Sequence, residues 1–205
     1  MSHERCVRYE SGRGAADLHV GTIEGSYTAA RRSARLEHVQ RVAVVGSGGA
    51  GKTTFANELG RRTGLPVVHL DHIYWGPGWV ETPKDEWRER QSEHLSGDRW
   101  IVDGNYAATF DLRFERADTI IVLAPSRWTC TYRALRRCLI NRGRAVQSPG
   151  CPERLDLEFL LWVWRYPSQT RPLLEAALEQ FGRADVVVEL KTHSEVRAFL
   201  DGATT

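Results

Sequence analysis

The stretch GSGGAGKTT, residues 46–54, constrains the fold more than any other part of the sequence. Its order, a glycine, four further residues and then glycine, lysine and threonine, is that of a Walker A phosphate-binding loop. Glycines let backbone N–H groups turn toward phosphate oxygens, Lys52 adds a positive charge, and the Thr53 hydroxyl can bind magnesium. The pattern therefore predicts ATP and Mg²⁺ as cofactors. The expected nucleotide-binding residues are Gly46, Ser47, Gly48, Gly49, Ala50, Gly51, Lys52, Thr53 and Thr54.

The residues on either side of this loop predict a strand that leads into it and a helix that leaves it. Residues 41–45 form the apolar, β-branched run that is typical of a buried parallel strand. Residues 52–62 place their apolar side chains on one helical face, and Gly64 ends that helix.

Strand and helix patterns alternate from Gln40 onward, which predicts an α/β fold: a three-layer P-loop NTPase with a five-stranded parallel sheet and helices on both faces. The later strands are expected at residues 66–71, 99–105, 117–125 and 185–190. Further helices are expected to start at a Thr82 cap with Pro83 in the first position, to run over 127–141, to break at Pro167, and to start at a Thr192–Glu195 capping box.

The chain of 205 residues is long enough for one well-buried domain, which we assign to residues 39–205, with a helical lid at about 136–156. Residues 1–38 are rich in Gly, Ser, Arg and Glu and show no sustained periodicity, so we expect a disordered extension. A basic regulatory arm is the alternative for this segment.

Composition narrows the functional classes. The net charge of +2 favours no particular partner, and the four cysteines lack the spacing of a zinc site. We therefore expect reduced thiols and a cytoplasmic protein. No apolar run approaches the ~20 residues needed to span a bilayer, so neither a membrane partner nor a secretory signal is expected.

Two aspartates are expected at the carboxyl ends of strands, where ligands bind in open α/β sheets. Asp71 would end the second strand, and could orient an acceptor hydroxyl, act as its base or hold the magnesium shell. Asp103 would end the third strand, at the position of a Walker B carboxylate, and with Thr53 is the expected metal ligand. Which aspartate serves the metal is left open, and a turn or helix cap is the alternative for each.

The segment 127–154 is strongly basic, with seven arginines and one acid, a net charge of +6. A kinase needs a lid that excludes water and brings positive charge to the transferring phosphoryl group. We therefore predict an arginine-lined lid, with Arg137, Arg142 and Arg144 as catalytic residues beside Lys52 and Asp71. A solvated basic helix is the alternative.

The acceptor is expected to bind beyond Asp71, where several aromatic and polar residues follow the second and third strands. Stacking on an aromatic wall would suit a base or another ring, although core packing explains the aromatic residues almost as well. Arg113 could hold an anionic group of the acceptor. The expected substrate-binding residues are Asp71, Trp75, Trp79, Asn105, Tyr106 and Arg113.

A P-loop alone does not choose the reaction. The guanine signature of GTPases is missing, and one domain is too small for a transporter ATPase, which leaves a small kinase as the favoured class. A plain NTPase and a nucleic-acid-linked regulator stay open, although no DNA-reading element is evident and nucleic acid is an unlikely partner. The acceptor, the choice between ATP and GTP and the oligomeric state are not determined by the sequence.

Several stretches together resemble the adenylate-kinase-like P-loop proteins that are labelled "DNA topology modulation protein", or FlaR-like. These stretches are VVGSGGAGKTT, GLPVVHLDHIYWGPGW, WIVDGNY, DLRFERADTIIVL, LRRCLINRGR and CPERLDLEFLLWVWRYP, which cover nearly all of residues 40–200. The resemblance implies a nucleoside-monophosphate-kinase type of fold, use of ATP and magnesium, and a mobile lid near residues 137–144. DGNY stands where adenylate kinases carry their AMP-site signature, so the acceptor implied by the resemblance need not be AMP.

Overall fold

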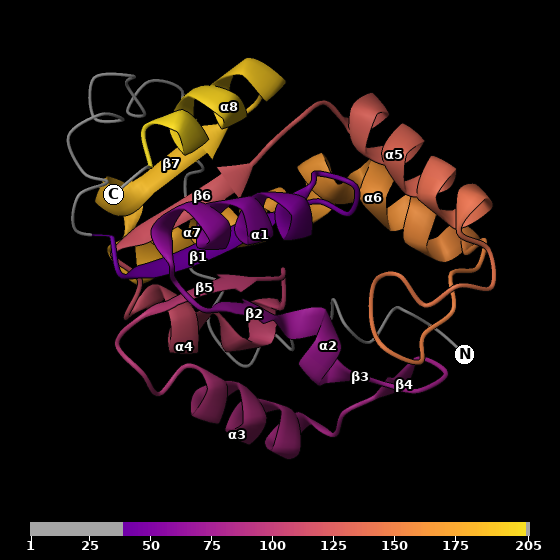
Figure 1. The fold of residues 1–205 in the computed structure, drawn as a ribbon, viewed down its shortest axis with the longest axis horizontal. Helices are drawn as coiled ribbons and strands as arrows, with labels where there is room; N and C mark the ends of the chain where they lie inside the picture. The colour runs from indigo at the N-terminus through magenta and orange to yellow at the C-terminus, as the bar shows by residue number, and fades with distance from the viewer. Residues whose placement is uncertain (1–38, 204–205) are drawn as a thin grey trace, which may run out of the picture.

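The computed structural model of the protein describes residues 39–203. It is built on a parallel five-stranded sheet in the order β2-β5-β1-β6-β7, with helices on both faces (Figure 1). The strands are β1 (Arg41–Gly46), β2 (Val67–His69), β5 (Trp100–Asp103), β6 (Thr119–Leu123) and β7 (Val187–Leu190). The α/β fold class, the five parallel strands and the two helical layers predicted from the sequence are confirmed. The expected extension over residues 1–38 lies outside the described residues.

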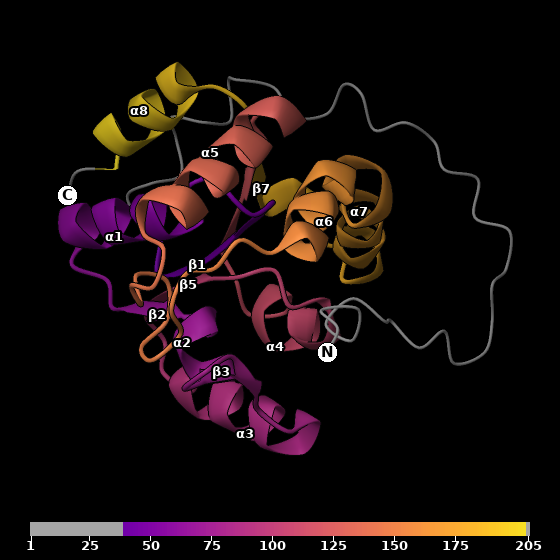
Figure 2. The same ribbon diagram turned by 90° about the vertical axis from the view of Figure 1, so that its right-hand side faces the viewer.

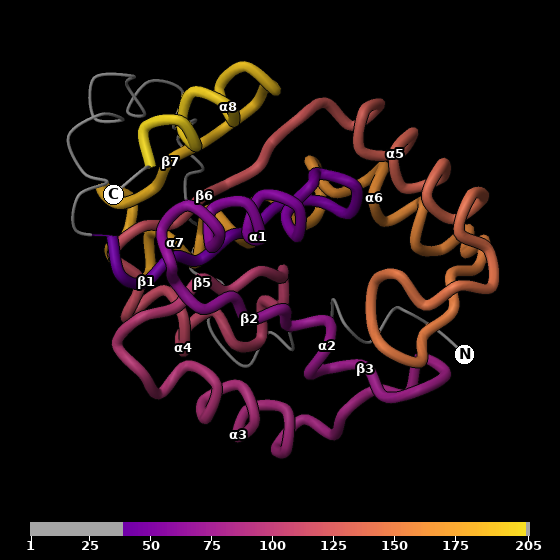
Figure 3. The backbone as a smooth tube through the Cα atoms, in the orientation of Figure 1, coloured from indigo at the N-terminus to yellow at the C-terminus, as the bar shows by residue number. Residues whose placement is uncertain are grey.

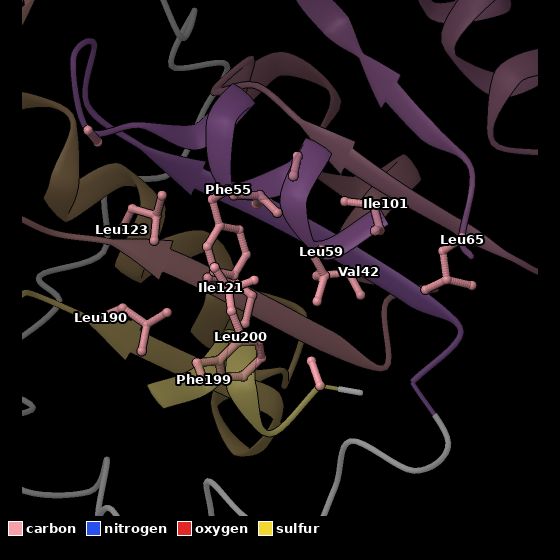
Figure 4. Close-up of a cluster of buried hydrophobic side chains, with 14 of the residues drawn as sticks. Val42, Phe55, Leu59, Leu65, Ile101, Ile121, Leu123, Leu190, Phe199 and Leu200 are labelled. Atoms are coloured by element: carbon pink, nitrogen blue, oxygen red, sulfur yellow. The ribbon is translucent and has the colours of Figure 1, made fainter. Parts of the chain in front are cut away.

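The central strand β1 supplies both hydrophobic cores, because successive side chains of a strand point to opposite faces. Val42 and Val44 belong to the core under α1 (Lys52–Thr63) and α8 (His193–Asp201), which Figure 4 shows. Ala43 and Val45 belong to the opposite core. That second core packs under α3 (Lys84–His94), α4 (Phe110–Phe114) and α7 (Arg171–Gln180).

Two helix boundaries follow the sequence closely. Gly64 ends α1 in the left-handed region with φ 67°, and its N–H donates to Gly60 O. The capping box at Thr192 and Glu195 opens α8 as predicted. The remaining short elements are the 3₁₀ turns η4 (Ala107–Thr109) and η5 (Ala184–Val186).

The segment after β2 differs from the prediction. The strand ends at His69, and Asp71 lies in the first turn of the short helix α2 (Leu70–Tyr74) rather than at a strand end. The antiparallel ribbon of β3 (Trp75–Gly76) and β4 (Val80–Glu81) follows. Leu70 and Tyr74 are four residues apart and both buried, so burial of one helical face outweighs the local strand preference.

Thr82 does not cap α3, whose N-cap is Pro83 without a side-chain cap. The Thr82 hydroxyl instead donates to Tyr74 O at 2.7 Å and so ties the chain after β4 back to α2. The prediction of this cap was wrong because a long-range partner takes the hydroxyl.

The segment predicted as a lid, residues 136–156, covers the end of α5 (Arg127–Ile140) and the loop 141–156, which leads into α6 (Leu157–Gln169). The two helices lie side by side, and the loop returns toward α2 and β3, as Figures 2 and 3 show. Pro167 does not break the helix: α6 continues to Gln169, and α7 begins at Arg171 with a proline in its first turn. Val163 and Tyr166 are buried on α6, and this packing holds the helix through the proline.

In the part of the chain that the structure describes, no helix has the length and apolar character that crossing a membrane requires.

Candidate functional site

The loop between β1 and α1 is held by close backbone packing that only glycine permits. A Cβ on Gly46, with φ 147°, would lie 2.4 Å from Leu123 O. A Cβ on Gly49, with φ 76°, would lie 2.2 Å from Cys130 O. The loop is therefore packed between β6 and α5 in a conformation that residues with a Cβ could adopt only with strain. The helix α1 begins directly after it, at Lys52.

Lys52 is folded back over the loop. Its Nζ donates to Gly46 O and to Ser47 O, each at 3.0 Å. Burial lowers the pKa of Lys52, and the nearby carboxylates Asp71 and Asp103 oppose that shift. The ammonium group therefore stands beside the loop, facing the region between the two aspartates.

Asp103 is the last residue of β5, and it pairs in register with Val44 of β1 and with His69 of β2. Its Oδ2 accepts a hydrogen bond from Thr53 Oγ1 at 2.8 Å, and its Oδ1 lies 2.7 Å from His69 Nδ1. The hydrogen bond to Asp103 raises the pKa of His69. The structure thus brings together Thr53 and Asp103, the two residues that the sequence assigned to a metal.

His69 belongs to this site although no sequence motif indicates it. Its Nε2 lies 3.1 Å from Asn57 Oδ1, so the imidazole is fixed from both sides. The order of the strands could have indicated this contact. When β2 pairs with β5, His69 at the end of β2 lies beside Asp103 at the end of β5.

Asp71 is contacted by two separate segments, the segment after β5 and the loop 141–156. Its Oδ1 accepts from Tyr106 OH at 2.6 Å, and its Oδ2 accepts from Gln147 Nε2 at 3.2 Å. Its backbone oxygen accepts from Ser148 Oγ at 3.1 Å. The segment after β5 and the loop 141–156 therefore both fix the position of Asp71.

The lid loop is docked on the segment 72–79 by further bonds. His72 Nε2 lies 2.9 Å from Gln147 O, and Gly78 N–H donates to Gly150 O at 2.9 Å. Trp79 Nε1 donates to Pro152 O at 2.9 Å. Among the described residues Trp79 is the one non-glycine residue with positive φ, 66°, a conformation that bulky side chains adopt only when the surroundings impose it. The loop 141–156 therefore lies against the segment 72–79.

Between these parts lies a cleft of about 710 Å³. It is lined by Gly48 and Lys52 of the P-loop, by Asp71 and Tyr106 opposite them, and by residues of α5, the loop 141–156, α6 and the start of α7. This volume lies in the range of about 300–1,000 Å³ that is usual for sites of small molecules.

Three of the predicted aromatic and polar contacts line the cleft together, namely Trp75, Trp79 and Tyr106. The rings of Trp75 and Trp79 meet edge to face with centroids 5.5 Å apart. Tyr74 and Trp87 stand behind Tyr106 with ring centroids 4.8 and 4.9 Å from it. Tyr74 and Trp87 are buried in the core, whereas substrate contact by Trp75, Trp79 and Tyr106 stays a prediction.

Asn105 also lines the cleft, where its Oδ1 joins two elements. It accepts from Gly46 N–H at 3.4 Å and from Tyr166 OH at 3.3 Å. Asn105 therefore connects the P-loop to α6.

No protein-family model matches the chain, and no curated protein sequence matches it. Three solved structures of low similarity are a shikimate kinase from Acinetobacter baumannii in complex with shikimate, a gluconokinase from Sinorhizobium meliloti 1021 and a shikimate kinase from Bacteroides thetaiotaomicron. Their sequence identities are 16%, 18% and 16%, and their TM-scores 0.48, 0.48 and 0.47. The matches cover 81%, 80% and 80% of this chain and 91%, 91% and 96% of those chains. At these values the similarity assigns no substrate or reaction to this chain.

The lid arginines divide into two groups. Arg137 lines the cleft, with its Nε 3.1 Å from Glu153 Oε1 and its guanidinium 5.7 Å from the centre of the Phe159 ring. Arg142 and Arg144 are exposed at the start of the loop and are not part of the cleft wall. The backbone of this stretch pairs with Glu153: Gly143 N–H donates to Glu153 O, and Glu153 N–H donates to Arg144 O.

Arg113 lies in the core rather than in the cleft. Its guanidinium is fully buried, donates to Gly104 O and Tyr106 O at 2.7 Å each, and lies 5.0 Å from the centre of the Phe110 ring. Burial lowers the pKa of Arg113 to about 9. The expected contact of Arg113 with an anionic acceptor is therefore not possible in this structure, and the residue instead supports the loop that carries Tyr106.

Proposed function

We propose that the protein is an ATP- and Mg²⁺-dependent phosphotransferase that transfers the γ-phosphoryl group of ATP to an acceptor hydroxyl beside Asp71. The observation that carries the proposal is the single cleft that joins Lys52 of the P-loop to Asp71, with the lid loop hydrogen-bonded to Asp71 across it. The fold class and the P-loop agree with a kinase-like protein.

The donor end supports ATP as the nucleotide. The backbone of residues 46–51 would bind the β-phosphate, and Lys52 would exchange its bonds to Gly46 O and Ser47 O for phosphate oxygens. Arg137 would add a second positive charge from the lid side of the cleft. The start of α1 contributes its helix N-terminus in the same place.

The residues at this end fit a magnesium ion. Mg²⁺ prefers oxygen ligands and is usually bound by one or two carboxylates together with phosphates and water. Thr53 and Asp103 offer a hydroxyl and a carboxylate whose oxygens lie 2.8 Å apart. Among residues 39–203 no group of three or more His, Cys, Asp and Glu is placed to hold a metal ion. When bound, Mg²⁺ would neutralise charge on the β- and γ-phosphates.

At the acceptor end, Asp71 is the proposed base. The acceptor hydroxyl would replace Tyr106 or Gln147 as a hydrogen-bond donor to the carboxylate. Asp71 would take the hydroxyl proton as the acceptor oxygen bonds to the γ-phosphorus and the bond to the β-phosphate oxygen of the leaving ADP breaks. Trp75 and Trp79 would flank the body of the acceptor.

The closed lid supports transfer over hydrolysis. Four backbone or side-chain bonds dock the loop on the segment 72–79, and a closed lid excludes the water that would compete with the acceptor. A plain NTPase needs no such contact between lid and acceptor segment. The role in DNA topology that the sequence resemblance implied has no support of its own in these contacts and stays a prediction.

A transfer assay tests the proposal. The full chain is incubated with γ-labelled ATP, Mg²⁺ and a panel of nucleosides, nucleotides, sugars and hydroxy acids, beside a reaction without acceptor. The proposal expects label in one class of acceptor at a rate above that of phosphate release in the control. Release of inorganic phosphate alone, at the same rate with every acceptor, would make the protein an NTPase.

A further inference from the structure

The ends of β2 and β5 are joined to α1 by a ring of polar contacts, and the proposed chemistry leaves its histidine without a role. Thr53 Oγ1 donates to Asp103 Oδ2 at 2.8 Å, and Asp103 Oδ1 lies 2.7 Å from His69 Nδ1. His69 Nε2 lies 3.1 Å from Asn57 Oδ1. Thr53 and Asn57 are four residues apart on α1, so they lie on one side of that helix and close the ring.

The contact between His69 and Asp103 defines which ring nitrogen carries a proton. An ionised carboxylate only accepts hydrogen bonds, so the contact at 2.7 Å requires that Nδ1–H donates to Oδ1. The two side chains are 15% and 6% exposed, so water has little access to the contact. The hydrogen bond is therefore of the short, charge-assisted kind that holds a carboxylate in one orientation.

The two oxygens of the Asp103 carboxylate have different partners. Among residues 39–203, the side-chain hydrogen bonds of this carboxylate are those with Thr53 at Oδ2 and with His69 at Oδ1. Thr53 is itself a proposed ligand of magnesium, so Oδ2 is the oxygen on the side of the proposed metal site. His69 contacts the other oxygen, and so restrains the carboxylate without occupying Oδ2.

We propose that His69 is a positioning residue of the magnesium site, which holds Asp103 through Oδ1 so that Oδ2 stays directed toward Thr53 and the metal. This inference rests on the proposed function for the presence of the metal. His69 acts through Asp103 and is not itself a ligand, and Asn57 restrains the far side of its ring. Removing a residue that orients a metal ligand typically weakens metal binding by about 10- to 100-fold.

Two substitutions of His69 separate the roles of its two ring nitrogens. The amide nitrogen of asparagine is bonded to Cγ, as Nδ1 of histidine is, so His69→Asn keeps a donor near Asp103 Oδ1. The amide nitrogen of glutamine is one bond further from the backbone, as Nε2 is, so His69→Gln keeps a partner for Asn57 and loses the donor to Asp103. His94→Gln, at the exposed end of α3, is the control.

Binding of Mn²⁺ in place of Mg²⁺ tests the proposal without a measurement of activity. The full chain, in excess over a non-hydrolysable ATP analogue so that the analogue is bound, is titrated with Mn²⁺. The free ion is followed by electron paramagnetic resonance, and displacement by Mg²⁺ shows that both ions use one site. Affinity for the analogue and thermal unfolding without metal are measured for each variant, so that a loss of stability is separated from a loss of metal binding.

We expect His69→Gln to bind Mn²⁺ about tenfold or more weakly than the unmodified chain, and His69→Asn to stay within about threefold of it. The His94→Gln variant should bind Mn²⁺ like the unmodified chain. Equal affinity in the unmodified chain, His69→Asn and His69→Gln, or an equal loss in the two His69 variants, would overturn the inference while leaving the proposed function intact.

Failure of the ATP analogue to bind the unmodified chain would instead contradict the proposed function. The same Mn²⁺ titration of the nucleotide-free protein would then decide the role of His69: weaker binding in His69→Gln than in His69→Asn supports it, and equal or absent binding overturns it.

A second measurement decides the matter if His69→Gln does not fold. The imidazole ¹⁵N resonances of the unmodified chain are recorded, with those of His69 assigned from His69→Asn. We expect Nδ1 of His69 to carry a proton and its signal to shift when Mg²⁺ binds. A ring without a proton on Nδ1, or a signal that Mg²⁺ does not move, would overturn the inference.

Discussion

The donor half and the acceptor half of the cleft are built in different ways. The donor half is a continuous run of residues: Lys52 bonds to oxygens five and six positions before it, and the loop turns directly from β1 into α1. The acceptor half is assembled from distant segments, since Asp71 is bonded to Tyr106, 35 residues away, and to Gln147, 76 residues away. The donor half can therefore be recognised from a short stretch of sequence, whereas the acceptor half can be recognised only once the fold is known.

The largest effect is expected from the donor half. Lys52→Ala should lower the rate of ATP turnover by about 10³-fold or more, because it removes a charge that faces the phosphates in the transition state. Steady-state kinetics with thermal unfolding of the same variant measure this. Lys84→Ala, an exposed lysine at the start of α3, is the control and should be unchanged. Unchanged turnover of ATP in Lys52→Ala would contradict the proposed role of the P-loop.

The next largest effect on the rate of transfer is expected from the arginines of the predicted lid. The sequence predicted Arg137, Arg142 and Arg144 as catalytic residues, whereas only Arg137 lines the cleft. Arg137→Met should slow transfer by about 10²-fold, because Arg137 lines the cleft. The double variant Arg142→Met with Arg144→Met should change the rate less than about threefold, as both side chains are exposed. Comparison of kcat for the two proteins is the measurement. The opposite order would mean that the loop moves these two arginines into the cleft during the reaction.

A smaller effect is expected from the contact between the two loops of the acceptor half. Gln147→Leu removes the donor to Asp71 Oδ2 and should lower kcat for transfer by about tenfold, the value of one hydrogen bond to a charged group. Phosphate release without acceptor should rise relative to transfer, since the lid is less firmly docked. Gln180→Leu, exposed at the end of α7, is the control. An unchanged ratio of transfer to hydrolysis would show that the hydrogen bond between Gln147 and Asp71 plays no part in transfer.

The smallest effect concerns the link between α6 and the P-loop. Burial raises the pKa of Tyr166 to about 12. A phenol that stays protonated in the folded state contributes stability that is full below pH 10 and is lost as the pH rises toward 12. The free energy of unfolding should therefore fall over this range, and Tyr166→Phe should flatten that fall by about 1 kcal/mol or more. Urea unfolding at several pH values checks this, with the exposed Tyr132→Phe as control; equal slopes in both variants would contradict it.

These differences explain how far the sequence could predict the molecule. The strand and helix patterns around Gly46–Thr54, the buried strands and the last capping box are local signals, and the fold class follows from their alternation. The pairing of Thr53 with Asp103 also follows once β5 is placed next to β1.

What the sequence could not provide depends on packing across the fold. Arg113 has the residue type of an anion ligand, yet its side chain is buried among Phe110 and two backbone oxygens, which no local pattern indicates. Arg142 and Arg144 were chosen because they border the loop, but both side chains are exposed and neither lines the cleft.

The central claim is that the cleft transfers a phosphoryl group from the P-loop to an acceptor activated by Asp71. The most direct test is the partition of γ-labelled phosphate between acceptor and water, measured side by side for the unmodified chain and Asp71→Asn with ATP binding determined for both. The account predicts that Asp71→Asn binds ATP as before but transfers label to the acceptor at least about 10²-fold more slowly. Transfer at an unchanged rate in Asp71→Asn would contradict the account.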